Sequence, residues 1–183
     1  AQGAGIQSAE TVARLGADLT AFSFNGNKTV TAGGGGMVVG DDAALLQRAR
    51  HISTTARSGA DYTHDAVGFN YRLTNLQAAV GCAQMERLEA LVGRKRRIAA
   101  AYAEAFAGLP GIGGFPAPAG VESACWFSGF TLDEAHAEAA PGLRDALRAA
   151  GIDARPFWRP LPAQPPFAEA PCEGAGTAAS LSR

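Results

Sequence analysis

The sequence predicts an α/β protein, because short apolar runs with the composition of buried strands alternate with longer segments that have helical spacing. The expected strands are Asp18–Phe24, Met37–Val39, Ala124–Leu132 and Ile152–Phe157. The expected helices are Ala43–Ile52, a long one from about Leu76 to Phe106, Pro141–Ala150 with Gly151 as its C-terminal cap, and the beginning of another at Gly176–Arg183. Such alternation favours sheets covered by helices over an all-helical or all-strand fold.

Turn residues and caps predict the boundaries of these elements. The glycine run makes Thr29–Val39 a hairpin-like pair of strands, and His51–Ala66 is expected to be a long polar loop. Thr74 or Asn75 is a good N-cap for the long helix. Gly93 is expected to bend or break that helix.

The composition excludes several classes of partner. The 183 residues carry a net charge of -1, which gives no electrostatic footprint for nucleic acid or an anionic membrane. No apolar run approaches the roughly 20 residues of a membrane helix, and the first residues show no signal-peptide pattern. Cys82, Cys125 and Cys172 are widely spaced, which fits a reduced cytoplasm better than a disulfide framework or a zinc site. We therefore expect a cytoplasmic protein with no metal.

The stretch Ala21–Gly40 has the strongest chemical signal. Lys28 follows an apolar strand and precedes the glycine run Gly33–Gly36 and a second short strand. A lysine on the turn after a buried strand has a cramped, partly dry environment, and only a neutral amine attacks a carbonyl. Glycines allow a positive φ or a close approach of the backbone to a bulky cofactor.

Two other kinds of segment also place a lysine near glycines. A phosphate-binding P-loop needs glycines where Asn27 and Phe22 stand, so that motif is excluded. A solvated surface lysine beside a flexible glycine hairpin is the more common arrangement when such a stretch is considered alone.

Two ordered motifs resemble the DegT/StrS-type sugar aminotransferases. Ser23–Lys28, followed by Gly33–Met37, is similar to the family's Schiff-base lysine segment, although Gly34 stands where the family commonly has glutamate. The second match is Gly68–Arg72, followed by Asn75–Leu88. The resemblance covers nearly the whole chain.

The resemblance implies a fold type I transferase, similar to aspartate aminotransferase, that uses pyridoxal 5'-phosphate. Residues 1–92 would be the C-terminal part of the large cofactor-binding domain, and residues 93–183 an incomplete small α+β domain. The chain would then be an internal fragment of a longer enzyme. The turn that holds the phosphate and the aspartate that pairs with the pyridine nitrogen would precede Ala1.

The resemblance also implies roles for five residues. Lys28 would carry the cofactor and move a proton, and Ser23 would bind its phosphate. Gln2 would lie near its phenolic oxygen, and Asn70 would reach the phosphate in the partner subunit. Arg72 would bind a phosphate or carboxylate of the substrate. The alternative for Gln2 is an ordinary polar residue near a terminus, and for Asn70 and Arg72 it is a role in helix entry.

The activity implied is transfer of an amino group, with glutamate as the donor, to the 4-keto group of a nucleotide-linked deoxysugar for surface polysaccharides. Ser53–Ala56 and His64–Asp65 resemble the subgroup that acts on UDP-linked 4-keto-6-deoxy-N-acetylhexosamines. The alternatives are a GDP-perosamine-type synthase and a binding domain of the same fold without turnover. A related dehydratase would have histidine in place of Lys28. The active form is expected to be a homodimer with shared sites.

Overall fold

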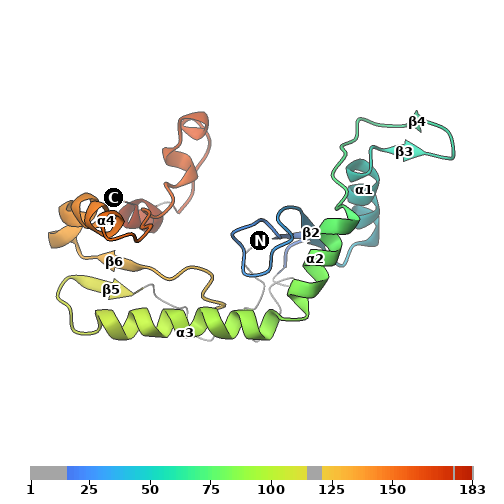
Figure 1. Cartoon of the computed structure of the whole chain (residues 1–183). Coiled ribbons are helices and arrows are strands. Elements are labelled where there is room, and N and C mark those ends of the chain that lie inside the picture. The colour runs from blue at the N-terminus through green and yellow to red at the C-terminus, as the bar shows by residue number, and fades with distance from the viewer. Residues whose placement is uncertain (1–15, 115–120, 175, 183) are drawn as a thin grey trace. The chain divides into compact units, whose positions relative to one another are not determined.

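The computed structural model describes residues 16–114, 121–174 and 176–182 (Figure 1). These residues form two compact units. The first unit takes in the described residues up to Tyr102 together with 121–128, and the second takes in 103–114 and the described residues from Gly129 onwards. The residues that the sequence singles out as chemically important, Gln2 excepted, all lie in the described part of the first unit.

The strands on either side of Lys28 form one antiparallel hairpin. β1 (Thr20–Ser23) pairs with β2 (Gly36–Val39), with Ser23 opposite Gly36. Gly36 is required there, because a Cβ atom at that position would collide with the carbonyl oxygen of Phe22. The two strands confirm the expected apolar runs. The expected hairpin within Thr29–Val39 is wrong, because β2 pairs with the strand before Lys28 and not with the residues after it.

Helix α1 (Ala43–Ser53) and a small hairpin follow. The Asp42 carboxylate accepts hydrogen bonds from the N–H groups of Ala44 and Leu45, at 2.8 and 3.0 Å, and so caps the N-terminus of the helix. The expected polar loop contains a second antiparallel hairpin, β3 (Arg57–Ser58) with β4 (Thr63–His64), which extends beyond α1 in Figure 1. Two paired residues on each strand are too few to produce a periodic sequence signal.

The expected long helix is two helices, α2 (Asn75–Met85) and α3 (Leu88–Phe106). Thr74 is the N-cap of α2, and it exchanges hydrogen bonds with Gln77 in a capping box. The break lies between Met85 and Leu88 and not at Gly93, which is inside α3. A single glycine costs a helix only about 1 kcal/mol, so neighbouring helical residues are enough to continue α3 through it.

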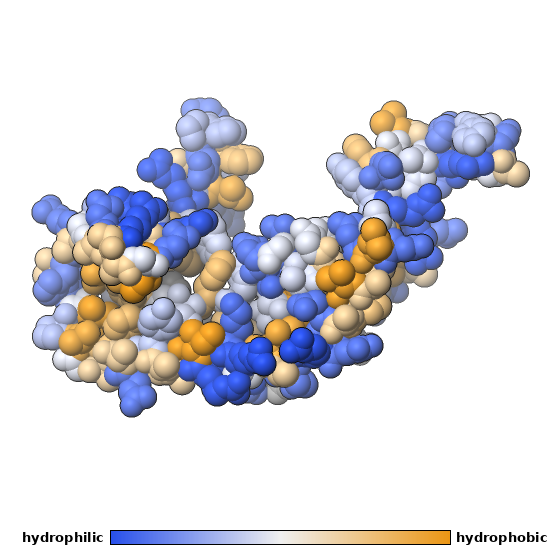
Figure 2. All heavy atoms as spheres, in the orientation of Figure 1, coloured by the Kyte–Doolittle hydropathy of each residue, from blue (hydrophilic) through white to orange (hydrophobic). Residues whose placement is uncertain are grey.

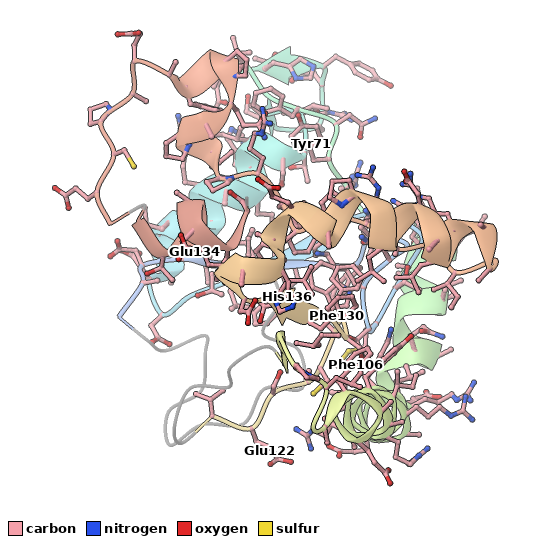
Figure 3. The ribbon with its side chains drawn as sticks, turned by 90° about the vertical axis from the view of Figure 1, so that its left-hand side faces the viewer. Tyr71, Phe106, Glu122, Phe130, Glu134 and His136 are labelled. Carbon is pink, nitrogen blue, oxygen red and sulfur yellow. The ribbon has the colours of Figure 1, made fainter. Side chains whose placement is uncertain are left out.

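The second unit contains one short hairpin and several helical segments. β5 (Ile112–Gly114) pairs with β6 (Phe130–Leu132), so the expected strand Ala124–Leu132 is confirmed only at its end. The helices, in chain order, are η2 (Glu134–Ala139), α4 (Ala140–Ala149), η3 (Leu161–Ala163), η4 (Pro165–Phe167) and α5 (Gly176–Leu181). Phe106 and Phe130 pack edge to face with ring centroids 5.0 Å apart, and they are turned toward each other in Figure 3.

The segment that joins α4 to η3 holds one correct and one wrong expectation. Gly151 has a φ of +80°, and its N–H donates to Arg148 O while the N–H of Ile152 donates to Leu147 O. This is the glycine-ended helix terminus that the sequence predicts. The expected strand Ile152–Phe157 is absent from this described segment, which is irregular. Pro156 has no N–H, so it cannot donate to a strand ladder.

The first unit buries few side chains, and these are small. Val30, Ala32, Ala56, Val92 and Ala124 are its buried apolar residues within the described part of the chain. Along α2, by contrast, Leu76 is 82% exposed, and Val80 and Met85 are about half exposed, and apolar side chains appear along this helix in Figure 2. Among the helices of the described residues, none has the length and apolar character to cross a membrane.

Candidate active site

Lys28 lies on a closed loop between β1 and β2. At the base of the loop the Phe24 N–H donates to Gly35 O at 3.0 Å, and the Ala32 N–H donates to Phe24 O at 2.9 Å. Within the loop the Lys28 N–H donates to Asn25 O at 3.0 Å, which forms a tight turn directly before the side chain. The Lys28 side chain is half-buried. The loop therefore fixes the backbone from which the amine projects.

The indole ring of Trp126 covers the amino group of Lys28. The Nζ atom lies 3.5 Å from the centroid of the ring, which is a cation–π distance. The indole Nε1–H donates a 2.6 Å hydrogen bond to the carbonyl oxygen of Asn27, the residue before Lys28. In the sequence, Trp126 falls in the expected strand Ala124–Leu132 and carries no signal of a role at the site. A contact across 98 residues of chain leaves no local signal that could have revealed it.

Trp126 is held in place by α3. The Arg96 Nε–H donates to Ser123 O at 2.8 Å, and the Arg96 guanidinium forms an ion pair with Glu122. Cys125 has a φ of +48°, a left-handed conformation that turns the chain immediately before Trp126, and its N–H donates to the Ser123 hydroxyl. The segment 122–126 is therefore anchored at one end on a helix and at the other on the lysine loop.

Ser23 is the last residue of β1. Its Oγ atom accepts a 3.3 Å hydrogen bond from the Asn25 N–H, and its side chain is half-buried. A hydroxyl that accepts in this way keeps its own proton for donation to a ligand. Ser23 and Lys28 are thus brought to one loop, with a hydroxyl at its beginning and an amine near its centre.

Asn70 and Arg72 lie on a second segment beside the end of α1. Asn70 forms an antiparallel bridge with Thr54. On either side of that bridge the N–H groups of Phe69 and Tyr71 donate to Ile52 O and Ser53 O, at 2.7 and 2.9 Å. The side chains of Asn70 and Arg72 are exposed. Backbone pairing positions this segment and leaves the amide and the guanidinium at the surface.

The backbone opposite Asn70 is strained. Thr55 and Ala56 have φ values of +70° and +50°, a region that residues other than glycine seldom adopt. Ala56 is fully buried. Strain of this kind persists only where the surroundings over-determine the conformation. Here Gly68 lies so close that a Cβ on it would be 2.5 Å from Ala56 N.

Two histidines fix the arm that carries β4. His51 on α1 and Asp65 form a hydrogen bond with 2.6 Å between Nε2 and Oδ1, and this bond holds the pKa of the Asp65 carboxyl below its usual value. The His64 Nδ1–H donates to Thr55 O at 2.7 Å. His64 and Asp65 belong to the motif from which a UDP-linked substrate is expected. In the structure their hydrogen bonds to Thr55 O and His51 order the backbone beside Asn70.

The glycine run lies where the lysine loop contacts the segment that leads into α2. A Cβ on Gly35 would collide with the side chain of Leu73, and a Cβ on Gly34 would lie 3.3 Å from the side-chain nitrogen of Gln77 on α2. Gly35 has a φ of +76°, a left-handed conformation that glycine adopts without steric strain. The sequence predicts that these glycines let the backbone approach a cofactor. At Gly34 and Gly35 they instead allow Gln77 on α2, and Leu73 just before it, to lie close to the lysine loop.

The structure groups the expected site residues in two pairs. Ser23 and Lys28 are on the hairpin loop, and Asn70 and Arg72 are on the segment before α2; within the described residues no hydrogen bond joins one pair to the other. Gln2 lies outside the described residues. No group of three or more potential metal ligands occurs in the described part of the chain.

The donor set fits pyridoxal 5'-phosphate. That molecule presents an aldehyde, which an amine attacks, and a phosphate, which hydroxyl and amide donors bind. The half-buried amine of Lys28 and the hydroxyl of Ser23, held on one rigid loop, match these two requirements. Asn70 adds an exposed amide on the neighbouring segment.

Comparison with known proteins supports the predicted fold. A pyridoxal phosphate-dependent aminotransferase of Bacillus subtilis, EpsN (putative by its name), is 41% identical over 147 residues, 80% of this chain and 37% of the relative. The GDP-perosamine synthase of Vibrio cholerae is 36% identical over 151 residues, 82% of this chain and 41% of the relative.

The structure is also similar to solved structures. The crystal structure of DesV from S. venezuelae, in complex with a ketimine intermediate, superposes with a TM-score of 0.81 at 28% identity, covering 99% of this chain and 48% of that one. The expected α/β fold of fold type I is therefore confirmed. The chain spans less than half the length of each of these relatives. The model of the DegT/DnrJ/EryC1/StrS aminotransferase family matches residues 1–181, and the chain belongs to that family.

Proposed function

We propose that the protein of which this chain is part transfers an amino group to a nucleotide-linked keto sugar with the help of pyridoxal 5'-phosphate, and that Lys28 carries the cofactor. The observation that supports this most is the position of Lys28. Lys28 lies in the segment that resembles the family's lysine motif and within the residues that the family model matches, and it is half-buried on a loop closed by backbone hydrogen bonds. Glutamate is the proposed donor of the amino group.

Each proposed residue has a defined task. Bound pyridoxal phosphate supplies the electron sink that stabilises negative charge at the reacting carbon. The Lys28 amine would hold the cofactor by replacing its aldehyde oxygen, which leaves as water, and in its free form would take a proton from the substrate carbon or return one to it. The Ser23 hydroxyl and the Asn70 amide donate to phosphate oxygens, and the Arg72 guanidinium binds an anionic group of the substrate. Gln2 is proposed to lie near the phenolic oxygen.

The domain division proposed for the chain follows from the same fold. Residues 1–92 would complete a cofactor-binding domain and residues 93–183 would begin a smaller one. A division within α3 is supported by the boundary of the first compact unit at Tyr102, although 121–128 return to that unit. The three free cysteines are compatible with the reduced cytoplasm proposed as its location.

The substrate proposed first is a UDP-linked 4-keto-6-deoxy-N-acetylhexosamine for surface polysaccharides, on the strength of Ser53–Ala56 and His64–Asp65. The similarity to the GDP-perosamine synthase of Vibrio cholerae favours a GDP-linked 4-keto sugar as the second candidate. A competition assay with equal concentrations of both substrates separates them. Preferential amination of the UDP sugar is expected, and preference for the GDP sugar would replace the first candidate by the second.

We further propose a homodimer in which Asn70 serves the partner's site. Exposed apolar side chains surround Asn70 in sequence, which supports an interface there: Tyr62 is 84% exposed, Val67 is 87% exposed and Tyr71 is 74% exposed. Exposed apolar residues that gather on one segment are typical of contact surfaces.

The direct test of the proposed function uses the complete protein. Borohydride reduction in the presence of pyridoxal phosphate should add the mass of the reduced cofactor to the peptide that contains Lys28. Lys28→Ala should lose both this adduct and transamination. The matched control is Lys95→Ala, since these are the two lysines of the sequence. Turnover at the wild-type rate by Lys28→Ala would refute the assignment.

A further inference from the structure

From the contact between Lys28 and Trp126 we infer that Trp126 is a positioning residue, whose indole face is the resting place of the Lys28 ammonium whenever that amine is not bonded to the cofactor. This inference rests on the proposed function, in which Lys28 alternates between a bonded and a free state. The observation behind the inference is that the Nζ atom of Lys28 lies 3.5 Å from the centroid of the Trp126 ring.

The contact has the geometry of a cation–π interaction. The negative face of the indole attracts an ammonium and offers no comparable attraction to a neutral amine. Both side chains are half-buried, so water screens this attraction less than it would at a fully exposed site. The ring would hold the lysine after the amine takes up a proton and release it after the proton leaves. That is the property required of a resting place beside a reacting centre.

A free lysine otherwise has many positions available. Its four-carbon stem has many rotamers, so an amine that nothing holds spends much of its time away from the reacting atoms. The loop hydrogen bonds fix only the backbone of Lys28. The indole face is the contact that defines where the end of the side chain lies.

The indole ring of Trp126 is a rigidly held platform for the Lys28 amine. Its Nε1–H is bonded to Asn27 O at 2.6 Å, which ties the ring to the backbone one residue before the lysine. Phe127 stacks on Trp126 with ring centroids 4.1 Å apart. Arg96 holds the preceding segment through Ser123 O. A ring needed only to fill space would not require these directional contacts to both the lysine loop and α3.

Trace acetylation of the cofactor-free complete protein tests the inference without using turnover. Acetic anhydride reacts with neutral amines only, and mass spectrometry of peptides gives the ratio of Lys28 to Lys95 labelling, in which Lys95 cancels changes in reagent. At pH 8 the Lys28 ratio should rise about two- to tenfold in Trp126→Leu, because the indole face no longer covers and holds the amine. Trp158→Leu, which changes the other tryptophan of the sequence, should leave the ratio unchanged.

Trp126→Phe separates the ring from the hydrogen bond. Phenylalanine keeps an aromatic face and lacks the Nε1–H donor, so its labelling ratio should lie between those of the wild type and Trp126→Leu. A ratio in Trp126→Phe equal to that in Trp126→Leu would assign the effect to the Asn27 hydrogen bond and overturn the platform. An unchanged ratio in Trp126→Leu, or an equal rise in Trp158→Leu, would also overturn it.

A spectroscopic measurement gives the reciprocal view. Lys28→Met should change the near-ultraviolet absorbance of the indole, and the same difference spectrum should vanish in a Trp126→Phe background. A difference spectrum that persists in that background would refute the contact. If Trp126 is not the resting place of the amine, the borohydride adduct on Lys28 still forms and is still lost in Lys28→Ala. If the proposed function is wrong, the adduct itself is missing. The two failures are therefore distinguishable.

Discussion

The replacement Gly68→Ala tests how the fold positions Asn70. A Cβ atom on Gly68 would lie 2.5 Å from Ala56 N and 2.8 Å from Thr55 Cα, and both are backbone atoms that no rotamer change can move. The two segments would have to separate by roughly 1 Å to reach ordinary van der Waals contact. That separation stretches the hydrogen bonds from Thr55 N–H to Phe69 O and from Phe69 N–H to Ile52 O, now 3.0 and 2.7 Å long.

The magnitude follows from these contacts. Overpacking costs about 1–3 kcal/mol, and each weakened hydrogen bond contributes about 1 kcal/mol, so the free energy of unfolding should fall by about 2–4 kcal/mol. A shift of about 1 Å at Asn70 should lower kcat/KM by one to two orders of magnitude.

Urea unfolding and steady-state kinetics of the complete protein measure the two effects. Gly81→Ala is the control, because its Cβ would lie 3.7 Å from Ala32 Cβ, an ordinary contact, within α2. Alanine in a helix is favoured over glycine by about 1 kcal/mol, so Gly81→Ala should be neutral or stabilising. If Gly68→Ala matched Gly81→Ala in stability and activity, the close crossing of the two segments would be refuted.

Three more outcomes are expected. Mixing Lys28→Ala subunits with Asn70→Asp subunits should restore part of the activity that neither parent has, because one site of a hybrid dimer carries both changes and the other carries none; exchange confirmed by mass without recovered activity would contradict the shared site. Asp65 has a lowered pKa through its hydrogen bond with His51, so its contribution to stability is present above the ordinary carboxyl pKa of about 3.9 and is lost as pH falls through the lower folded-state value. Asp65→Asn should therefore lose less stability than the wild type between about pH 5 and 2, and parallel urea midpoints across that range would contradict this. Thr74→Ala removes the N-cap of α2 and should cost about 1 kcal/mol in urea unfolding, whereas Thr74→Ser should be nearly neutral.

Local signals in the sequence predict several elements of the fold. The apolar runs before and after Lys28 are β1 and β2, and Thr74 and Gly151 end or begin helices as expected. These features depend on a few neighbouring residues, which is why sequence alone is sufficient. The same locality explains the motif that carries the family resemblance, since Ser23 and Lys28 lie on a single loop.

Features that depend on distant residues are the ones that the sequence did not predict. The partner of β2 is the strand before Lys28, with Ser23 opposite Gly36 as the innermost pair and Thr20 opposite Val39 as the outermost, and no local pattern specifies that pairing. The cover of Lys28 by Trp126 depends on Arg96 and on a left-handed Cys125. Neither contact has a sequence period or a spacing that would have identified it.

The glycine run shows how one motif can serve a second purpose. Its residues were expected to make room for a cofactor, but Gly35 and Gly34 face Leu73 and Gln77, at the beginning of α2. A glutamate at Gly34, which the family commonly has, would place its Cβ 3.3 Å from the Gln77 side-chain nitrogen, a distance that requires the glutamine to move by a few tenths of an ångström. Gln77 also completes the capping box with Thr74. The side chains of Leu73 and Gln77, which follow Asn70 and Arg72, thus lie directly against the glycines that follow Lys28, so the segments that carry the two pairs of expected site residues contact each other at Gly34 and Gly35.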